Sequence, residues 1–213
     1  MNRSVLYLHG FASSPRSDKP VALARLLADD RLSIDAPDLN APSFEWLSLE
    51  AMVARALDAA RRNPTAAIVG SSLGSVVALE VLRHGVNAPV VLLAPAIGIG
   101  DLWISRCPDG DPITVWNHAR GENAAIHRAF FERMSRFDAG QPALSVPVVI
   151  FMGTADESIP FEGVLAVWER WKAAGRLSRR SRFVAIEGGD HRLTAEIERI
   201  SNEIRAMAAP RRQ

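Results

Sequence analysis

The chain has 213 residues, a length that fits one ordinary α/β domain and is too short for two full catalytic domains. Its 25 Lys and Arg residues against 24 Asp and Glu residues give a net charge of +1, which argues against nucleic acid or an anionic membrane as a partner. An apolar fraction of 48% excludes a disordered or collagen-like chain, and one cysteine, Cys107, excludes an intramolecular disulfide framework.

The N-terminal sequence does not resemble a signal peptide, because its apolar run, residues 5–8, is far too short for one. No apolar stretch has the roughly 18 to 20 residues that a membrane-spanning helix needs. A single cysteine also fits a reducing compartment. We therefore expect a cytoplasmic protein that is a monomer or a weak homodimer and has no membrane or nucleic-acid partner.

Short apolar runs alternate along the chain with longer segments of helical periodicity, and Gly, Pro or Ser residues separate them. In chain order the expected elements are strand 5–8, helix 21–28, strand 32–36, helix 47–61, strand 66–69, helix 73–83, strand 90–93, strand 148–152, helix 164–174, strand 183–186 and helix 193–207. Continuous apolar runs are typical of parallel strands buried on both faces. The pattern therefore predicts an α/β fold with a mostly parallel sheet of about six strands and helices on both faces.

Residues 97–143 interrupt this alternation. Their first half is rich in Gly and Pro, and apolar residues at near-helical spacing predict at least one helix over 122–137. Because long excursions from compact domains are usually functional, we interpret this segment as a small lid inserted into a single domain, 1–213. Four of its side chains are candidates for an apolar acyl pocket, although core packing would explain them equally well: Trp103, Trp116, Ile126 and Phe130.

The sequence GSSLG at residues 70–74 lies between a predicted strand and a predicted helix. This is the context of a nucleophile elbow, a sharp turn that exposes a serine and requires small neighbours. Gly70 and Gly74 meet that requirement, so Ser72 is the candidate nucleophile. A phosphate-binding or simple packing turn is the alternative, but no Walker lysine follows the motif.

A serine hydroxyl needs a base within hydrogen-bond reach and a third group that orients the base. His191 follows the last predicted strand in a glycine-rich loop, and Asp156 follows the strand before it. The order Ser72, Asp156, His191 is the order found in α/β hydrolases. Glu157 is the alternative acid, and Asp190 is better explained as a loop or helix N-terminal residue.

The other four histidines have simpler interpretations. His84 precedes Gly85 at the end of a predicted helix and is expected to cap it. His118 and His127 lie in the insertion, where surface or packing roles are expected. His9 precedes a glycine at a strand end, and we favour a structural role for it.

The remaining catalytic requirement is an oxyanion hole made of two backbone N–H groups. One should belong to the residue after the nucleophile, Leu73. The other should come from the loop after the first strand, HGFASSP at residues 9–15, and Phe11 is the candidate. By itself that loop could equally be an ordinary strand-to-helix connection.

Together, HGFASSP, GSSLG, the Ala-Pro-Ala at residues 94–96 and EGGDH at residues 187–191 resemble the small bacterial YqiA-like esterases of the α/β-hydrolase superfamily. The resemblance extends over nearly the whole chain and is weakest in the insertion. It implies a compact α/β-hydrolase core and carboxylesterase activity on short acyl esters. Ser75 stands where such families usually have glycine or another small residue, and it keeps the position small.

The residues thus predict a serine hydrolase of the esterase type that works through an acyl-serine intermediate, without a metal or an organic cofactor, and the resemblance implies that its substrates are small acyl esters. A thioesterase or a carbon–carbon bond hydrolase would use the same residues. A non-catalytic binding protein could also keep the fold with an idle pocket. These alternatives stay open at the level of sequence.

Overall fold

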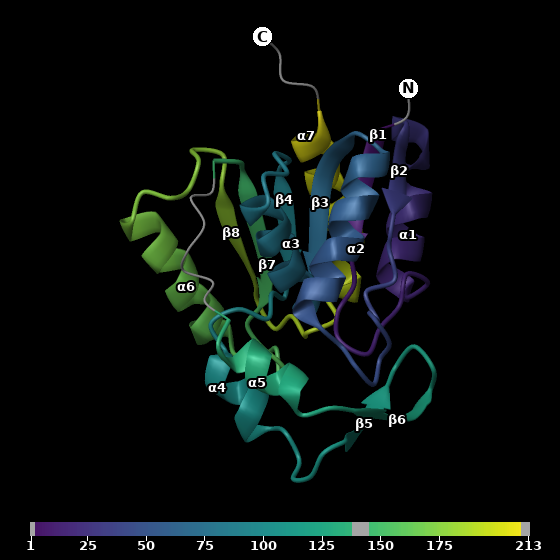
Figure 1. Cartoon of the computed structure of the whole chain (residues 1–213). Coiled ribbons are helices and arrows are strands. Elements are labelled where there is room, and N and C mark those ends of the chain that lie inside the picture. Colours follow the sequence, from purple (N-terminus) through teal and green to yellow (C-terminus); the bar gives the residue numbers. More distant parts are fainter. Residues whose placement is uncertain (1–2, 138–144, 210–213) are drawn as a thin grey trace.

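The computed structural model describes residues 3–137 and 145–209. Its main sheet has six parallel strands in the spatial order β2-β1-β3-β4-β7-β8 (Figure 1). These are β1 (Arg3–Leu8), β2 (Leu32–Asp35), β3 (Thr65–Ser71), β4 (Val90–Leu93), β7 (Val148–Gly153) and β8 (Arg182–Ile186). All six predicted strands are present, and because they are parallel, the loops that follow them meet along one edge of the sheet.

Helices cover both faces of this sheet, as the sequence pattern predicts. The five long helices are α1 (Asp18–Leu27), α2 (Leu49–Arg62), α3 (Leu73–Arg83), α6 (Phe161–Ala173) and α7 (Ile197–Ala208). α1 packs against α7, and α2 packs against α3 on the opposite face (Figure 1). None of the described helices has both the length and the apolar character needed to cross a membrane.

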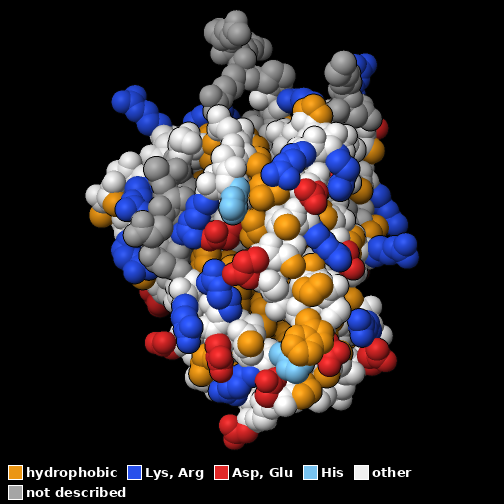
Figure 2. Space-filling model, in the orientation of Figure 1, with side chains coloured by type: hydrophobic (Ala, Val, Ile, Leu, Met, Phe, Trp, Pro, Cys, Tyr) orange, Lys and Arg blue, Asp and Glu red, His pale blue; other side chains and the backbone are white. Residues whose placement is uncertain are grey.

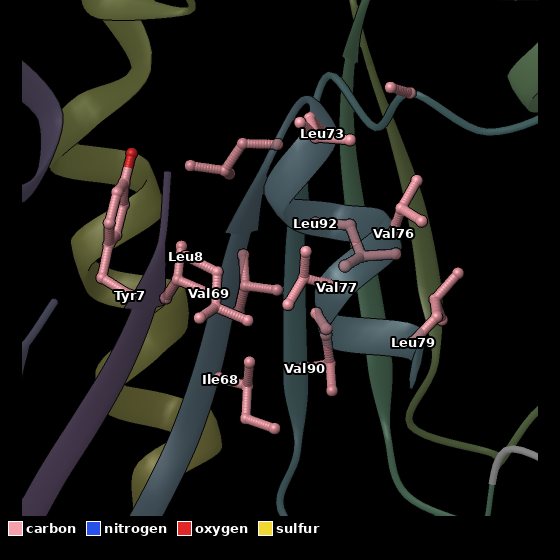
Figure 3. Packing of buried hydrophobic residues seen from close by; sticks show 14 of the residues in the cluster. Tyr7, Leu8, Ile68, Val69, Leu73, Val76, Val77, Leu79, Val90 and Leu92 are labelled. Carbon is pink, nitrogen blue, oxygen red and sulfur yellow. The ribbon is translucent and has the colours of Figure 1, made fainter. Parts of the chain in front are cut away.

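The core extends along the sheet and the helices that cover it, and Figure 3 shows the part of it where β3 and β4 pack against α3. Every residue of β4 is buried, as expected for a central strand covered on both faces. Val69, Leu92 and Val77 are completely buried there. This packing fixes the start of α3 relative to the end of β3, which is where the GSSLG motif lies.

The segment between β4 and β7 extends below the carboxyl ends of the strands (Figure 1). We call residues 97–137 the insertion. It contains α4 (Gly100–Ser105), the hairpin strands β5 (Ile113–Asn117) and β6 (Glu122–Ile126), and α5 (Ala129–Ser135). The last part of the predicted insertion, residues 138–143, lies outside the described residues.

The prediction of a helix over 122–137 is wrong in its first half. Residues 122–126 form β6, which pairs antiparallel with β5, and the helix begins only at Ala129. Gly121, with φ of 67°, turns the chain back on itself, and Asn117 accepts a hydrogen bond from the Arg120 N–H through its side chain. The conformation of residues 122–126 is therefore decided by their pairing with β5, which the periodicity of the sequence cannot reveal.

Candidate active site

Ser72 lies between the last residue of β3 and the first residue of α3, where its φ is 51° and its ψ is −117°. A serine rarely adopts this backbone conformation, which costs on the order of 1–3 kcal/mol and persists only where surrounding contacts impose it. Three backbone hydrogen bonds do so: the Ser72 N–H donates to Leu93, and the Ser72 carbonyl accepts from Ser75 and Ala96. The motif therefore forms the strained strand-to-helix turn expected of a nucleophile elbow.

The small residues of the motif allow this turn to close. A Cβ on Gly70 would lie 2.7 Å from the Cα of Ser75, and a Cβ on Gly74 would lie 2.0 Å from the carbonyl oxygen of Leu8. Ser75 is completely buried and donates its hydroxyl to the Gly70 carbonyl at 2.8 Å. Ser75 thus fits the tight space and also bridges the two sides of the turn.

Gly74→Ala should destabilise the protein even though alanine is a better helix former by about 1 kcal/mol. The added methyl group would push α3 away from β1, and overpacking of this kind costs about 1–3 kcal/mol or more. The unfolding temperature of Gly74→Ala, compared with that of Gly175→Ala, measures the effect. Gly175 has open space around it, so an alanine there strains the positive φ of the backbone but clashes with no neighbouring atom. An unfolding temperature for Gly74→Ala at or above that of Gly175→Ala would contradict the predicted clash.

Asp156 lies in the loop after β7, and its side chain is fully shielded from solvent. One carboxylate oxygen is 2.8 Å from Nδ1 of His191, and the other accepts the N–H groups of Ser158 and Ile159, both at 2.8 Å. Burial opposes ionisation of Asp156, but the hydrogen bonds from His191, Ile159 and Ser158 outweigh it and hold its pKa below the ordinary value. Glu157, the alternative acid, is exposed and makes no hydrogen bond within the described residues.

Since an ionised carboxylate accepts only, Nδ1 of His191 carries the proton of this hydrogen bond and leaves Nε2 as the acceptor. The loop that bears His191 is pinned to the loop after β7, because the Ala155 N–H donates to the Gly189 carbonyl. Asp190 accepts the N–H groups of Arg192 and Leu193 through one oxygen, at 3.0 and 2.9 Å. Asp190 therefore shapes the loop, as expected, and does not orient the imidazole.

Ser72 and His191 line the same cavity, which has a volume of about 890 Å³. Within the described part of the chain, no hydrogen bond joins the Ser72 hydroxyl to His191 or to any other group. Catalytic hydrogen bonds are often long without substrate and tighten in the substrate complex. The structure thus brings the three predicted triad residues to one site, and the contact between Asp156 and His191 is formed there.

The two residues predicted to supply the oxyanion hole, Phe11 and Leu73, both belong to segments that lie next to Ser72. Leu73 is the first residue of α3, so its N–H has no acceptor within the helix. The loop after β1 lies against Ser72, since a Cβ on Gly10 would be 3.3 Å from the Ser72 Cβ. Phe11 follows in that loop and lines the cavity.

The sequence profile of the uncharacterised protein family UPF0227 matches residues 4–208. The chain belongs to this family. No curated protein matches the sequence.

Solved structures similar to this UPF0227 protein share the α/β-hydrolase fold, which confirms the predicted fold class. A putative hydrolase from Agrobacterium vitis is 23% identical with a TM-score of 0.76, covering 98% of this chain and 88% of the other. Est1E from Butyrivibrio proteoclasticus, solved with ferulic acid bound, is 16% identical with a TM-score of 0.73, covering 96% and 87%. A monoacylglycerol lipase from Paleococcus ferrophilus is 18% identical with a TM-score of 0.69, covering 96% and 94%.

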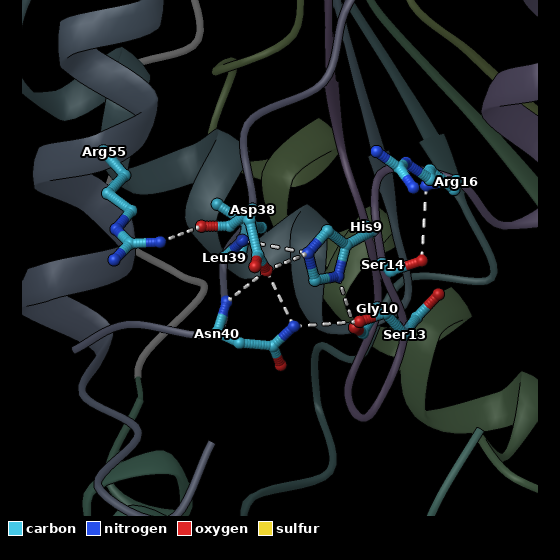
Figure 4. Close-up of polar contacts among 9 residues, drawn as sticks. All are labelled: His9, Gly10, Ser13, Ser14, Arg16, Asp38, Leu39, Asn40 and Arg55. Atoms are coloured by element: carbon cyan, nitrogen blue, oxygen red, sulfur yellow. Dashed lines mark hydrogen bonds and ion pairs between the residues drawn. The ribbon is translucent and has the colours of Figure 1, made fainter. Parts of the chain in front are cut away.

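His9 has a structural role in this UPF0227 protein (Figure 4). Its ring is buried; Nε2 accepts the Leu39 N–H at 2.9 Å and Nδ1 lies 2.9 Å from the Gly10 carbonyl. Since Nε2 accepts, the neutral ring carries its proton on Nδ1 and donates it to Gly10. Asn40 adds a second link by donating to the Ser13 carbonyl at 3.1 Å. The loop bearing the predicted oxyanion donor is thereby fixed to the loop after β2.

Of the four residues predicted to contact substrate, only Trp103 lines the cavity. Trp116 on β5 is exposed, whereas Ile126 at the end of β6 is completely buried. Phe130 is buried with its ring stacked on that of Phe11, 5.9 Å between centroids.

The apolar cavity wall includes three insertion residues that sequence reasoning missed: Ile99, Leu102 and Phe131. Helical spacing marks them as apolar but does not show which of them face a cavity.

The remaining histidines occupy separate sites. His84 ends α3, as predicted for a capping position. His118 lines the cavity, whereas the ring of His127 lies tilted against that of Trp46, and its Nδ1 is 2.9 Å from a carboxylate oxygen of Asp111. The described residues contain no group of three His, Cys, Asp or Glu side chains able to hold a metal ion.

Proposed function

We propose that this protein is a serine hydrolase that cleaves carboxylic esters with small acyl groups. The observation that carries the proposal is the strained Ser72, which opens into a cavity shared with His191, itself hydrogen-bonded to a buried carboxylate. A serine, an imidazole and a shielded acid in this order and geometry have the roles of nucleophile, general base and orienting group.

Acylation begins when the Ser72 oxygen attacks the ester carbonyl carbon and Nε2 of His191 takes the hydroxyl proton. The carbonyl oxygen becomes an oxyanion, which accepts hydrogen bonds from the N–H groups of Phe11 and Leu73. Asp156 stabilises the imidazolium that forms. The carbon–oxygen bond to the alcohol then breaks, and the alcohol leaves with the proton from His191.

Deacylation repeats these steps with water. His191 removes a proton from water as the water oxygen attacks the acyl carbon, and the oxyanion forms again at the same two N–H groups. Collapse of the intermediate breaks the bond to Ser72, which recovers its proton from His191. The products are a carboxylic acid and an alcohol, so atoms and charge balance without a cofactor.

The acyl group has an apolar surface available in the cavity. Leu102, Trp103 and Phe131 come from α4 and α5 of the insertion, and Ile99 lies just before α4. The rings of Trp103 and Phe131 contact each other and that of Phe11. Burial of an acyl chain on these side chains contributes about 0.8 kcal/mol for each methylene group.

Hydrolysis of para-nitrophenyl esters with acyl chains of about two to twelve carbons tests the proposal. We expect turnover within the usual enzyme range of roughly 1 to 10³ s⁻¹ for the best chain length, with slower turnover once the chain outgrows the cavity. A fluorophosphonate probe should label Ser72, as located by peptide mass spectrometry. A folded protein that neither turns over any ester nor takes the label would refute the proposal.

A further inference from the structure

Cationic side chains gather around the cavity of the proposed active site. The cavity is lined by Arg16, Lys19, Arg106 and Arg192, and Asp18 is the one acidic side chain among the described lining residues. The whole chain carries a net charge of only +1, and the face in Figure 2 mixes acidic and basic side chains. The excess of positive charge is therefore a local property of the cavity, where field lines are focused.

Most of this positive charge is not neutralised by a neighbouring carboxylate. Arg192 pairs with Asp18 at 3.3 Å, but the Lys19 ammonium donates to the carbonyl of Arg192 at 2.8 Å, and Arg106 donates to the carbonyl of Ser158 at 2.8 Å. Carbonyl acceptors hold these cations in place without cancelling their charge. The guanidinium of Arg16 has no carboxylate partner within residues 3–137 and 145–209.

The Lys19 ammonium is partly buried and lies within the electrostatic field of a second cation and of three carboxylates. Its burial lowers the pKa of the ammonium, and the charge of Arg192 lowers it further, against the opposing effects of Asp190, Asp18 and Asp156. An anion beside Lys19 would offset both effects. α1 adds to the same field, because it starts at the cavity and Ser17, its N-cap residue, makes no side-chain cap hydrogen bond.

We propose that the substrates of this site are esters that carry an anionic group, a carboxylate or a phosphate, bound by Arg16 and Lys19 in the cavity. The inference rests on the proposed function and specifies its substrate class. The uncharged part of the acid or alcohol lies on the apolar wall formed by Leu102, Trp103 and Phe131. Arginine and lysine both donate charge-assisted hydrogen bonds to such oxygens.

Two pairs of matched esters test the proposal and separate the two sources of charge. The para-nitrophenyl monoester of glutaric acid is compared with para-nitrophenyl pentanoate, so that the charge lies on the acyl side. Acetylated glycerol phosphate is compared with acetylated glycerol, so that the charge lies on the alcohol side. We expect one pair to show a preference of at least about tenfold in kcat/KM for the anionic ester.

Arg16→Gln and Lys19→Gln should each lower this preference by a factor of about three to ten, measured as the ratio of kcat/KM values. Arg25→Gln is the matched control, since Arg25 is exposed in the last turn of the same helix and lies outside the cavity lining. It removes the same charge and should leave the ratio unchanged. Salt near 1 M should also shrink the wild-type preference, because the Debye length falls to about 3 Å.

The outcomes separate this inference from the proposed function. Ser72-dependent hydrolysis of the neutral esters without any anionic preference would overturn the substrate class and leave the hydrolase intact. The substrate class is also overturned if Arg25→Gln lowers the ratio as much as Arg16→Gln does, because the effect would then be one of overall charge. If all four esters are inert and Ser72 takes no fluorophosphonate label, the proposed function fails, and the substrate class fails with it.

Discussion

Replacing Ser72 with alanine should lower ester turnover by on the order of 10⁴ to 10⁶. The reason is that the hydroxyl supplies the bond to the acyl group, and no other group at the turn can take its place. The strain at this residue, with φ of 51°, is imposed by the surrounding hydrogen bonds, so alanine should adopt the same turn. The circular dichroism spectrum and the unfolding temperature of Ser72→Ala should therefore match those of the wild type, although its kcat is far lower.

Ser71→Ala is the matched control for this prediction. Ser71 precedes Ser72 in the motif and lines the same cavity, but it is the last residue of β3 and is nearly buried. Its side chain hydrogen-bonds to the phenol of Tyr7, and we expect Ser71→Ala to keep turnover within about tenfold of the wild type. Loss of activity and of fluorophosphonate labelling in Ser71→Ala but not in Ser72→Ala would show that Ser71, and not Ser72, is the nucleophile.

Asp156→Asn should lower kcat by on the order of 10⁴. The amide oxygen of asparagine can still accept the N–H groups of Ser158 and Ile159, so the loop after β7 should stay folded. Its NH₂ group, however, would then face Nδ1 of His191 and donate to it. The imidazole would be held in the tautomer with its proton on Nε2, which cannot accept the serine proton.

Measurements of kcat for Asp156→Asn and Glu157→Gln together identify the orienting acid. Glu157 is exposed, and we expect its glutamine variant to stay within a few-fold of the wild type. Full activity in Asp156→Asn together with a large loss in Glu157→Gln would reverse the assignment. Fluorophosphonate labelling should slow in Asp156→Asn as well, since the probe reports serine activation directly.

Much of the candidate site could be predicted because its parts are local in sequence. The GSSLG motif forms a strained turn because a strand precedes it and a helix follows it. Both elements can be recognised in the sequence as apolar runs. Asp156 and His191 each follow a strand that periodicity identifies. Since parallel strands place their carboxyl ends at one edge, chain order alone was enough to propose that these residues meet.

The insertion shows where such reasoning fails. The apolar residues over 122–137 fit a helical period, yet residues 122–126 pair with β5 because the turn before them reverses the chain. The sequence makes Trp103 and Phe130 equal candidates for substrate contact, but Trp103 lines the cavity and the ring of Phe130 stacks on that of Phe11. Periodicity shows that a side chain is apolar, and only packing shows what it faces.

The sequence by itself determined the order of the six main-sheet strands and the five long helices, the α/β class, and the identity of the candidate nucleophile, acid and base, because each depends on patterns within a few residues. The tertiary structure decided which side chains share a cavity. Three separate parts of the chain supply Arg16 with Lys19, Arg106 and Arg192, which look like ordinary surface charges in a nearly neutral protein. Folding brings them to one cavity, where their charges add because they are close in space.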